Sequence, residues 1–103
     1  MSNFKKVGKR MGVDFKDFAQ WMEAAMKARS PHRRLLNLYD KSLERVEVEE
    51  LKLQVWIRIN VDKPTFDADY RKRGERLAKV ERASVAALER VFGAYRRDRE
   101  SGQ

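Results

Sequence analysis

Apolar residues recur at helical spacing along most of this chain. The first such stretch spans residues 14–28 and follows Asp14, whose carboxylate is able to accept hydrogen bonds from the free N–H groups of a first helical turn. Its apolar members are Phe15, Phe18, Met22, Ala25 and Met26. The pattern predicts an amphipathic helix whose apolar stripe is ordinary core, with a docking surface for a partner as the alternative.

A second helix is predicted to begin at Ser30. Serine suits the N-cap, and Pro31 suits the first helical position because proline lacks only an N–H group that would be unpaired there. One face of this helix is expected to carry Leu35, Leu38, Tyr39, Ser42, Leu43 and Val46.

The stretch from Leu51 to Val61 fits two kinds of structure. Apolar residues occupy every second position, and several of them are β-branched, which is typical of a strand. The same residues also form stripes at helical spacing. A lone strand would leave its backbone groups unpaired unless a second chain supplied an edge. The rest of the chain favours a helix here, and the strand is the alternative.

The last segment, from about residue 65 to residue 97, predicts a long helix. Its apolar stripe consists of Leu77, Val80, Leu88, Val91 and Tyr95. Ser84 is the polar position on that stripe, and its small side chain suits a close helix contact. A continuous helix of this span is roughly 50 Å long, so part of it is expected to project or to pack on a partner.

The predicted fold class is therefore all-α, with three to four helices in a small bundle and a long C-terminal helix. The alternative is an α+β fold in which one long strand at 51–61 pairs with a second chain. Residues 1–13 are expected to form a basic N-terminal tail, and residues 14–103 a single helical domain.

Composition narrows the classes of function. The net charge of +8 favours acidic partners such as nucleic acid, an anionic membrane surface or an acidic protein. The absence of cysteine excludes disulfides, thiolate zinc sites and thiol nucleophiles. The single histidine, His32, stands at a helix start with no nucleophile placed beside it. We therefore expect no enzyme activity, no metal and no cofactor, and no apolar run is long enough to span a bilayer.

Two basic clusters suggest an alternative function. The first consists of Arg71, Lys72, Arg73 and Arg76, and the second of Arg96, Arg97 and Arg99. Such clusters are able to neutralise phosphates, with Tyr70 or Tyr95 available to stack on bases. They also fit solvated helix faces balanced by nearby acids. The alternative prediction is a small basic nucleic-acid-binding or regulatory protein, dimeric if residues 51–61 pair.

The stretch Ser30 to Leu43 carries Ser-Pro-His before a helix with a Leu38-Tyr39 pair. In this it resembles the opening helix of the 13-kDa matrix-arm subunit family of mitochondrial complex I, and it is similar to LYR-motif proteins. Ile57-Arg58 and the run from Tyr70 to Leu77 also resemble later parts of the LYR pattern. These families are small helical accessory subunits or assembly factors of respiratory complexes.

The resemblance implies a non-catalytic accessory or assembly subunit of a large mitochondrial respiratory complex, on the matrix side, acting through protein–protein contacts. Without it, the expected location is cytoplasmic. The residues expected to meet an acidic partner subunit are Arg33, Arg34, Leu38, Tyr39, Lys41 and Arg58. Asp40 follows the Leu-Tyr pair where the LYR family has the arginine that engages acyl carrier protein, so that protein is a less favoured partner.

Overall fold

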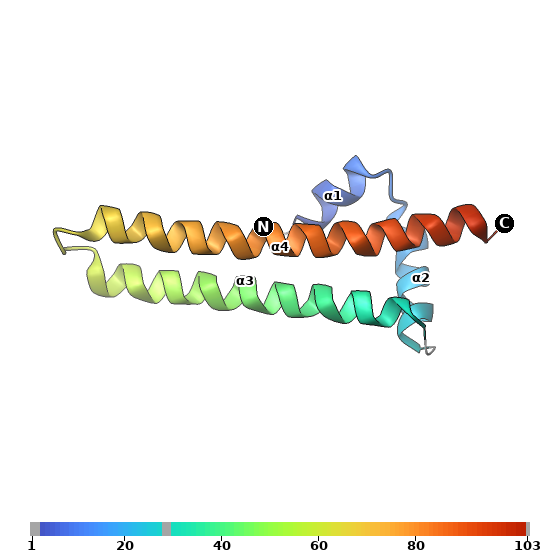
Figure 1. Cartoon of the computed structure of the whole chain (residues 1–103), viewed down its shortest axis with the longest axis horizontal. Coiled ribbons are helices and arrows are strands. Elements are labelled where there is room, and N and C mark those ends of the chain that lie inside the picture. The colour runs from blue at the N-terminus through green and yellow to red at the C-terminus, as the bar shows by residue number, and fades with distance from the viewer. Residues whose placement is uncertain (1–2, 28–29, 103) are drawn as a thin grey trace.

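Four helices make up the fold in the computed structural model, which describes residues 3–27 and 30–102 (Figure 1). They are α1 (Phe4–Arg10), α2 (Phe15–Lys27), α3 (His32–Asn60) and α4 (Phe66–Ser101). No strand occurs within those described ranges. The predicted all-α fold with a long C-terminal helix is confirmed.

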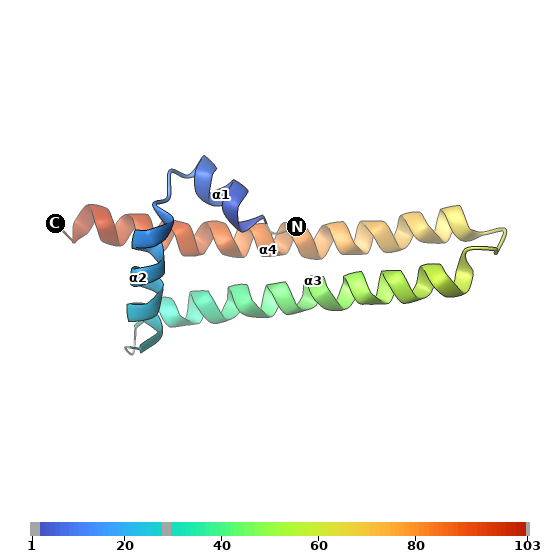
Figure 2. The same ribbon diagram turned by 180° about the vertical axis from the view of Figure 1, so that it is seen from behind.

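Helices α3 and α4 form a long antiparallel hairpin that sets the shape of the molecule (Figures 1 and 2). They contain 29 and 36 residues, and the molecule measures 61 × 26 × 18 Å. A tight turn joins them, in which the N–H of Lys63 donates to the carbonyl of Asn60 and the N–H of Phe66 donates to the carbonyl of Lys63. Pro64 in this turn is incompatible with a continued helix interior.

The strand alternative for residues 51–61 is wrong. Residues 51–60 belong to α3, whose backbone groups pair within the helix, so no second chain is needed to satisfy them. The alternating pattern has a helical explanation: residues two apart lie about 200° apart around a helix. Leu53 and Ile57 are consequently half-buried in the hairpin, whereas Leu51 and Val55 are exposed.

The hydrophobic core lies at one end of the hairpin, where α1 and α2 pack against α4 and the start of α3 (Figure 2). Phe92 of α4 is fully buried at its centre. Its ring centroid lies 4.9 Å from that of Phe18 and 5.2 Å from that of Phe4. We call this half the core end. The other half, residues 46–80, consists of two helices and their turn, and we call it the arm.

The segment that was expected to be a basic tail contributes to the core end. Residues 4–10 form α1, in which Val7 is buried. Gly8 allows the close approach, because a Cβ atom there would lie 2.5 Å from the ring of Phe15. The basic residues of α1 stay exposed, and Arg10 pairs with Glu89 of α4 at 2.9 Å. Residues 1–2 of the expected tail lie outside the described residues.

The predicted N-cap at Asp14 is confirmed, whereas α3 begins at His32 with Pro31 at its N-cap, one residue later than the N-cap predicted at Ser30. The carboxylate of Asp14 accepts from the backbone N–H groups of Lys16, at 3.1 Å, and Asp17, at 3.4 Å. The hydroxyl of Ser30 accepts from the N–H of His32 at 3.2 Å. The buried position expected for Ser84 is confirmed as well.

Four residues that were expected on apolar contact faces are exposed instead, namely Met22, Met26, Leu38 and Leu43. Leu38 and Leu43 lie on the flanks of α3, and α3 has only α4 and a short part of α2 against it. A bundle with a further long helix would have covered these flanks. The expectation failed because it assumed more packing than the chain provides.

Candidate functional site

A network of polar side chains holds α2 against the C-terminal end of α4. The carboxylate of Asp17 accepts from the hydroxyl of Tyr95 at 2.6 Å and from two nitrogens of Arg99 at 2.8 and 2.7 Å. These hydrogen bonds, chiefly the one from Tyr95, hold the pKa of Asp17 below its ordinary value. Burial, together with that same bond, raises the pKa of Tyr95.

Asp98 joins three helices at the same end. Its carboxylate accepts from the indole N–H of Trp21 at 2.8 Å and pairs with Nε2 of His32 at 2.9 Å. The indole hydrogen bond and the neighbouring His32 lower the pKa of Asp98. The rings of Trp21 and His32 also contact each other, with centroids 5.2 Å apart. His32 therefore has a structural partner. We call the contacts of Asp17 and Asp98 the clasp, because together they hold α2 and the start of α3 against the C-terminal end of α4.

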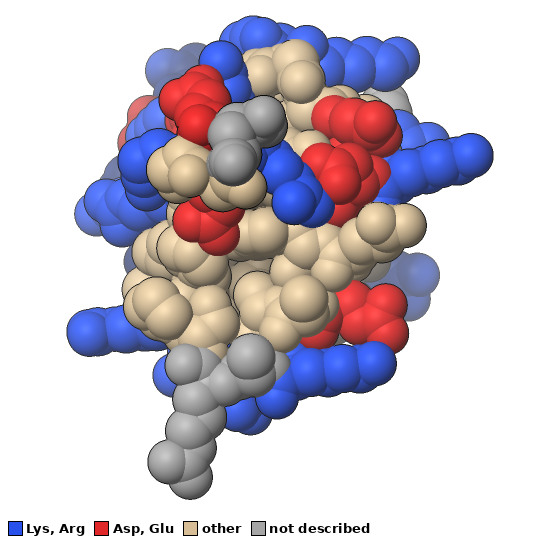
Figure 3. Space-filling model, turned by 90° about the vertical axis from the view of Figure 1, so that its right-hand side faces the viewer, with Lys and Arg blue, Asp and Glu red and all other residues tan. Residues whose placement is uncertain are grey.

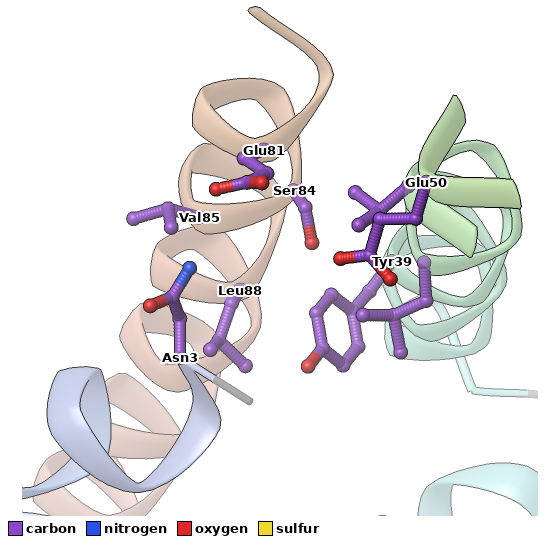
Figure 4. Close-up of a pocket in the computed structure, with 9 residues that line it drawn as sticks. Asn3, Tyr39, Glu50, Glu81, Ser84, Val85 and Leu88 are labelled. Carbon is purple, nitrogen blue, oxygen red and sulfur yellow. The ribbon is translucent and has the colours of Figure 1, made fainter. Parts of the chain in front are cut away.

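A small hollow lies between α3 and α4 where the core end meets the arm (Figure 4). Its volume is about 160 Å³. Tyr39 and Glu50 enter it from α3, and Glu81 and Ser84 lie across from them on α4. Burial raises the pKa of Tyr39, which keeps its hydroxyl protonated at neutral pH. His32 does not line this hollow, so the arrangement places no imidazole base beside these hydroxyl groups.

Along the arm, α3 exposes a second apolar face that points away from α4. Four residues form it, and we call them the outer stripe: Val48, Leu51, Val55 and Ile59, with 48, 61, 56 and 69% of their surface exposed. Their spacing of three and four residues places them in one row. The sequence contained this signal as one of the helical stripes noted in this stretch, where a helix was favoured over a strand.

The residues predicted to bind a partner do not form a single patch. Arg33, Arg34, Leu38 and Lys41 are exposed near the start of α3. Arg58 is exposed near the other end of that helix, roughly 25 Å further along. Tyr39 is turned inward to the hollow. The structure therefore separates the members of the Leu38-Tyr39 pair, with the leucine available at the surface and the tyrosine half-buried.

The two basic clusters also lie apart. Lys72, Arg73 and Arg76 line a shallow surface hollow near the tip of the arm, together with Trp56 and Asp69. Arg71 is exposed on the same helix segment. Arg96 and Arg97 are exposed on α4 at the core end, roughly 35 Å along the helix.

Three stacked aromatic rings accompany the basic cluster at the tip of the arm, whereas at the core end Arg99 lies 5.6 Å from the largely buried ring of Tyr95. The ring of Phe66 stacks between Trp56, at 5.1 Å, and Tyr70, at 5.6 Å, and the guanidinium of Arg73 lies 5.2 Å from the Trp56 ring. These three stacked rings, which we call the ladder, join α3 to α4 beside the turn. They form a small hydrophobic cluster at the tip of the arm. The exposed ring of Tyr70 ends the ladder at the surface.

The end face of the core differs from the arm. In Figure 3, uncharged side chains occupy the centre of this face, and Lys and Arg side chains project around its periphery. The exposed methionines Met22 and Met26 belong to α2, which lies at this end (Figure 1). Their exposure is moderate, at 39 and 38%, which is less than that of any member of the outer stripe.

Comparisons with known proteins give no relative. No family model matches the chain, and no curated protein and no solved structure matches it. None of the described helices is long and apolar enough to cross a membrane. In the described part of the chain, no three His, Asp or Glu side chains gather in a way that could hold a metal ion.

Proposed function

We propose that this protein is a non-enzymatic assembly protein that acts by protein–protein contacts, with the outer stripe of the arm as its docking surface. The observation that carries the proposal is the exposure of Val48, Leu51, Val55 and Ile59 in one row. Single exposed apolar residues are normal on a protein surface, whereas a contiguous row is typical of an interaction site.

The energetics support this assignment. Complete burial of a Val, Leu or Ile side chain is worth about 1.5–3 kcal/mol, and each stripe residue still exposes about half or more of its surface. Covering the stripe therefore offers a partner several kcal/mol. Because α3 is already folded against α4, the partner does not have to meet the cost of ordering the helix.

The narrower proposal is an accessory or assembly subunit of a respiratory complex on the matrix side of a mitochondrion. It is supported by the resemblance of residues 30–43 and by the exposed Arg33, Arg34 and Lys41, which suit an acidic neighbouring subunit. Asp40 is exposed beside them and would repel an acidic acyl carrier protein. This narrower proposal stays a prediction.

The test is affinity purification of the tagged chain from its native cell, in three matched forms. These are the wild type, Leu51→Asp on the outer stripe, and Ala86→Asp on an exposed position of α4. We expect protein partners in fixed ratio with the wild type and with Ala86→Asp, and their loss with Leu51→Asp. Equal recovery with all three forms would contradict the proposed docking surface, and respiratory-chain subunits among the partners would support the narrower proposal.

Nucleic-acid binding is the second candidate, and the hollow at the tip of the arm favours it. Lys72, Arg73 and Arg76 lie there beside Trp56, and Tyr70 offers an exposed ring for base stacking. The test is titration of a labelled single-stranded oligonucleotide between about 50 and 200 mM salt, where phosphate contacts weaken steeply. Binding that weakens with salt and is lost in Arg73→Glu would support it, and no binding would remove it.

A further inference from the structure

We infer that the outer stripe is a self-association surface, through which two copies of the chain pair α3 against α3 in parallel and in register. This inference rests on the proposed function, since it names the partner of the same surface. Two features of α3 carry it together, namely the apolar stripe and the charged residues that flank that stripe.

The stripe follows the heptad pattern of a parallel two-stranded coiled coil. With Val48 assigned to position a, Leu51 falls at d and Val55 at the next a, and Ile59 continues the row at position e. β-Branched residues at a with leucine at d favour two parallel strands over higher assemblies. The neighbouring a and d positions are charged, namely Lys41, Glu44 and Arg58, and each would face its own copy in the in-register pair. The apolar seam is therefore short, and the dimer is expected to be weak and concentration-dependent.

The charges beside the stripe are complementary in this arrangement. In a parallel pair, each g residue of one helix faces the e residue five positions later on the other helix. Here Glu47 faces Lys52 of the second copy, and Asp40 faces Arg45 of the second copy. Each pair occurs twice by the two-fold symmetry, and all four residues are exposed on α3.

Antiparallel pairing of the same stripe is disfavoured by those charges. An antiparallel pair brings e positions against e positions and g positions against g positions. In an antiparallel pair centred on the stripe, Lys52 of one copy would lie closest to Lys52 of the other, and the pairs of Glu47 with Lys52 and of Asp40 with Arg45 would be lost. The charges that flank the seam therefore favour the parallel register.

Most of the outer side of α3 is open to a second helix, with Trp56 of the same helix and Arg73 of α4 bordering the groove that the stripe lines. Helix α4 packs on the opposite side of α3, where Leu53 and Ile57 are half-buried. The outer side of α3 remains open towards its start, because the polar residues there are exposed, namely Arg34, Asn37, Lys41 and Glu44. Lys52 already pairs with Glu49 within the chain, but the distance of 3.8 Å is long and the lysine is able to turn towards a second copy.

Sedimentation equilibrium over a range up to millimolar concentration tests the association itself. We expect the wild type to approach twice its chain mass of 12.2 kDa, and Leu51→Asp to stay at the single-chain mass with unchanged helical circular dichroism. The control Ala86→Asp is expected to behave as the wild type. A wild type that stays at the single-chain mass throughout would overturn the inference.

Disulfide trapping tests the direction of pairing, because the chain has no cysteine of its own. In the parallel register, Val48→Cys lies opposite its own copy and is expected to form a covalent dimer under mild oxidation, whereas the control Ala86→Cys is not. In an antiparallel pair centred on the stripe, the two thiols introduced by Val48→Cys would lie roughly 16 Å apart. Trapping only in a mixture of Val48→Cys with Ile59→Cys would therefore overturn the parallel arrangement.

Charge exchange separates self-association from docking on another protein. Lys52→Glu alone is expected to weaken the dimer roughly tenfold, and Glu47→Lys combined with Lys52→Glu is expected to restore it, because the exchanged pair is again opposite in sign. Contacts with a different protein would not be restored by this exchange. If the wild type is a single chain yet loses its protein partners in Leu51→Asp, this inference fails and the proposed function stands.

Discussion

The two ends of the α3–α4 hairpin are built from the same two helices but differ in what covers them. At the core end, α1 and α2 add a cluster of aromatic rings, and Leu88, Val91 and Phe92 are almost fully buried. In the arm, each helix has only its neighbour, and the outer stripe of α3 is uncovered. The buried apolar contacts are therefore concentrated at the core end, whereas exposed apolar surface is concentrated in the arm.

This difference indicates a division of roles within a short chain. A small domain has little hydrophobic core to spare, and this one places nearly all of it where α1 and α2 meet the last turns of α4. The arm is left to be held by α3–α4 packing and by whatever binds its outer face. Binding of a partner to the outer stripe would therefore stabilise the arm more than the core end.

Phe92→Ala is expected to have the largest effect, because it would remove the ring at the centre of the core end. Truncation of a buried phenylalanine costs about 3–5 kcal/mol, which approaches the whole stability of a small domain. We expect the variant to be largely unfolded in thermal denaturation followed by circular dichroism. The matched truncation Ile59→Ala in the arm is expected to change the midpoint little, and similar losses in both variants would contradict the contrast between the two ends.

Native-state hydrogen exchange is expected to resolve the two ends within one molecule. Amides of residues 46–60 and 66–80 should exchange through local openings, and those of residues 84–95 only through global unfolding, because the arm buries few side chains. We expect the free energies of opening to differ by about 2 kcal/mol or more. Uniform protection along α4 would show that the hairpin opens as one unit.

A pair of glycine substitutions is expected to give opposite results at the two ends. Gly8→Ala would place its Cβ 2.5 Å from the ring of Phe15, and overpacking of this kind costs about 1–3 kcal/mol. Gly74→Ala, inside α4 in the arm, meets no atom within 4 Å and should stabilise the helix by about 1 kcal/mol. Urea denaturation of the two variants measures both. Destabilisation by Gly74→Ala would mean that this part of α4 is not a regular helix in solution.

Acid is expected to have the smallest effect, and to act on the core end. The lowered pKa values of Asp17 and Asp98 mean that their contribution to stability is complete above about pH 4–5, the ordinary range of a carboxyl group. It is lost as the pH falls through their lowered values in the folded state. The thermal midpoint of the wild type should fall below about pH 4, and Asp17→Asn should show a smaller fall. Asp62→Asn, in the exposed turn, serves as the control and should retain the wild-type profile.

Local signals were enough to predict the helices and several of their ends. Asp14 caps its helix as expected, and the second half of the α4 stripe, from Ser84 to Tyr95, is buried as expected. Leu38 and Leu43 were misplaced because a helical stripe tells which residues share a face and not how much of that face a neighbour will cover.

The spacing of apolar and polar residues could not predict contacts between residues that lie far apart in the sequence. Nothing in the sequence near Asp17 indicates that Tyr95 and Arg99 will bind it, since the partners are separated by 78 and 82 positions. The outer stripe is visible in the sequence as part of the alternation from Leu51 to Val61. Over so short a run, however, that alternation fits both a strand and a helix with two apolar faces.

The clasp at the core end has a consequence for how the protein is made. Because α2 is held by Asp98 and Arg99, the residues that secure it emerge from the ribosome long after α2 itself. At about 5–20 residues per second, some 4–16 s separate the synthesis of Asp17 from that of Arg99. For most of that interval the rings of Phe18 and Trp21 lack their partners Phe92, Tyr95 and Asp98, so the nascent chain exposes apolar surface of the kind that promotes aggregation.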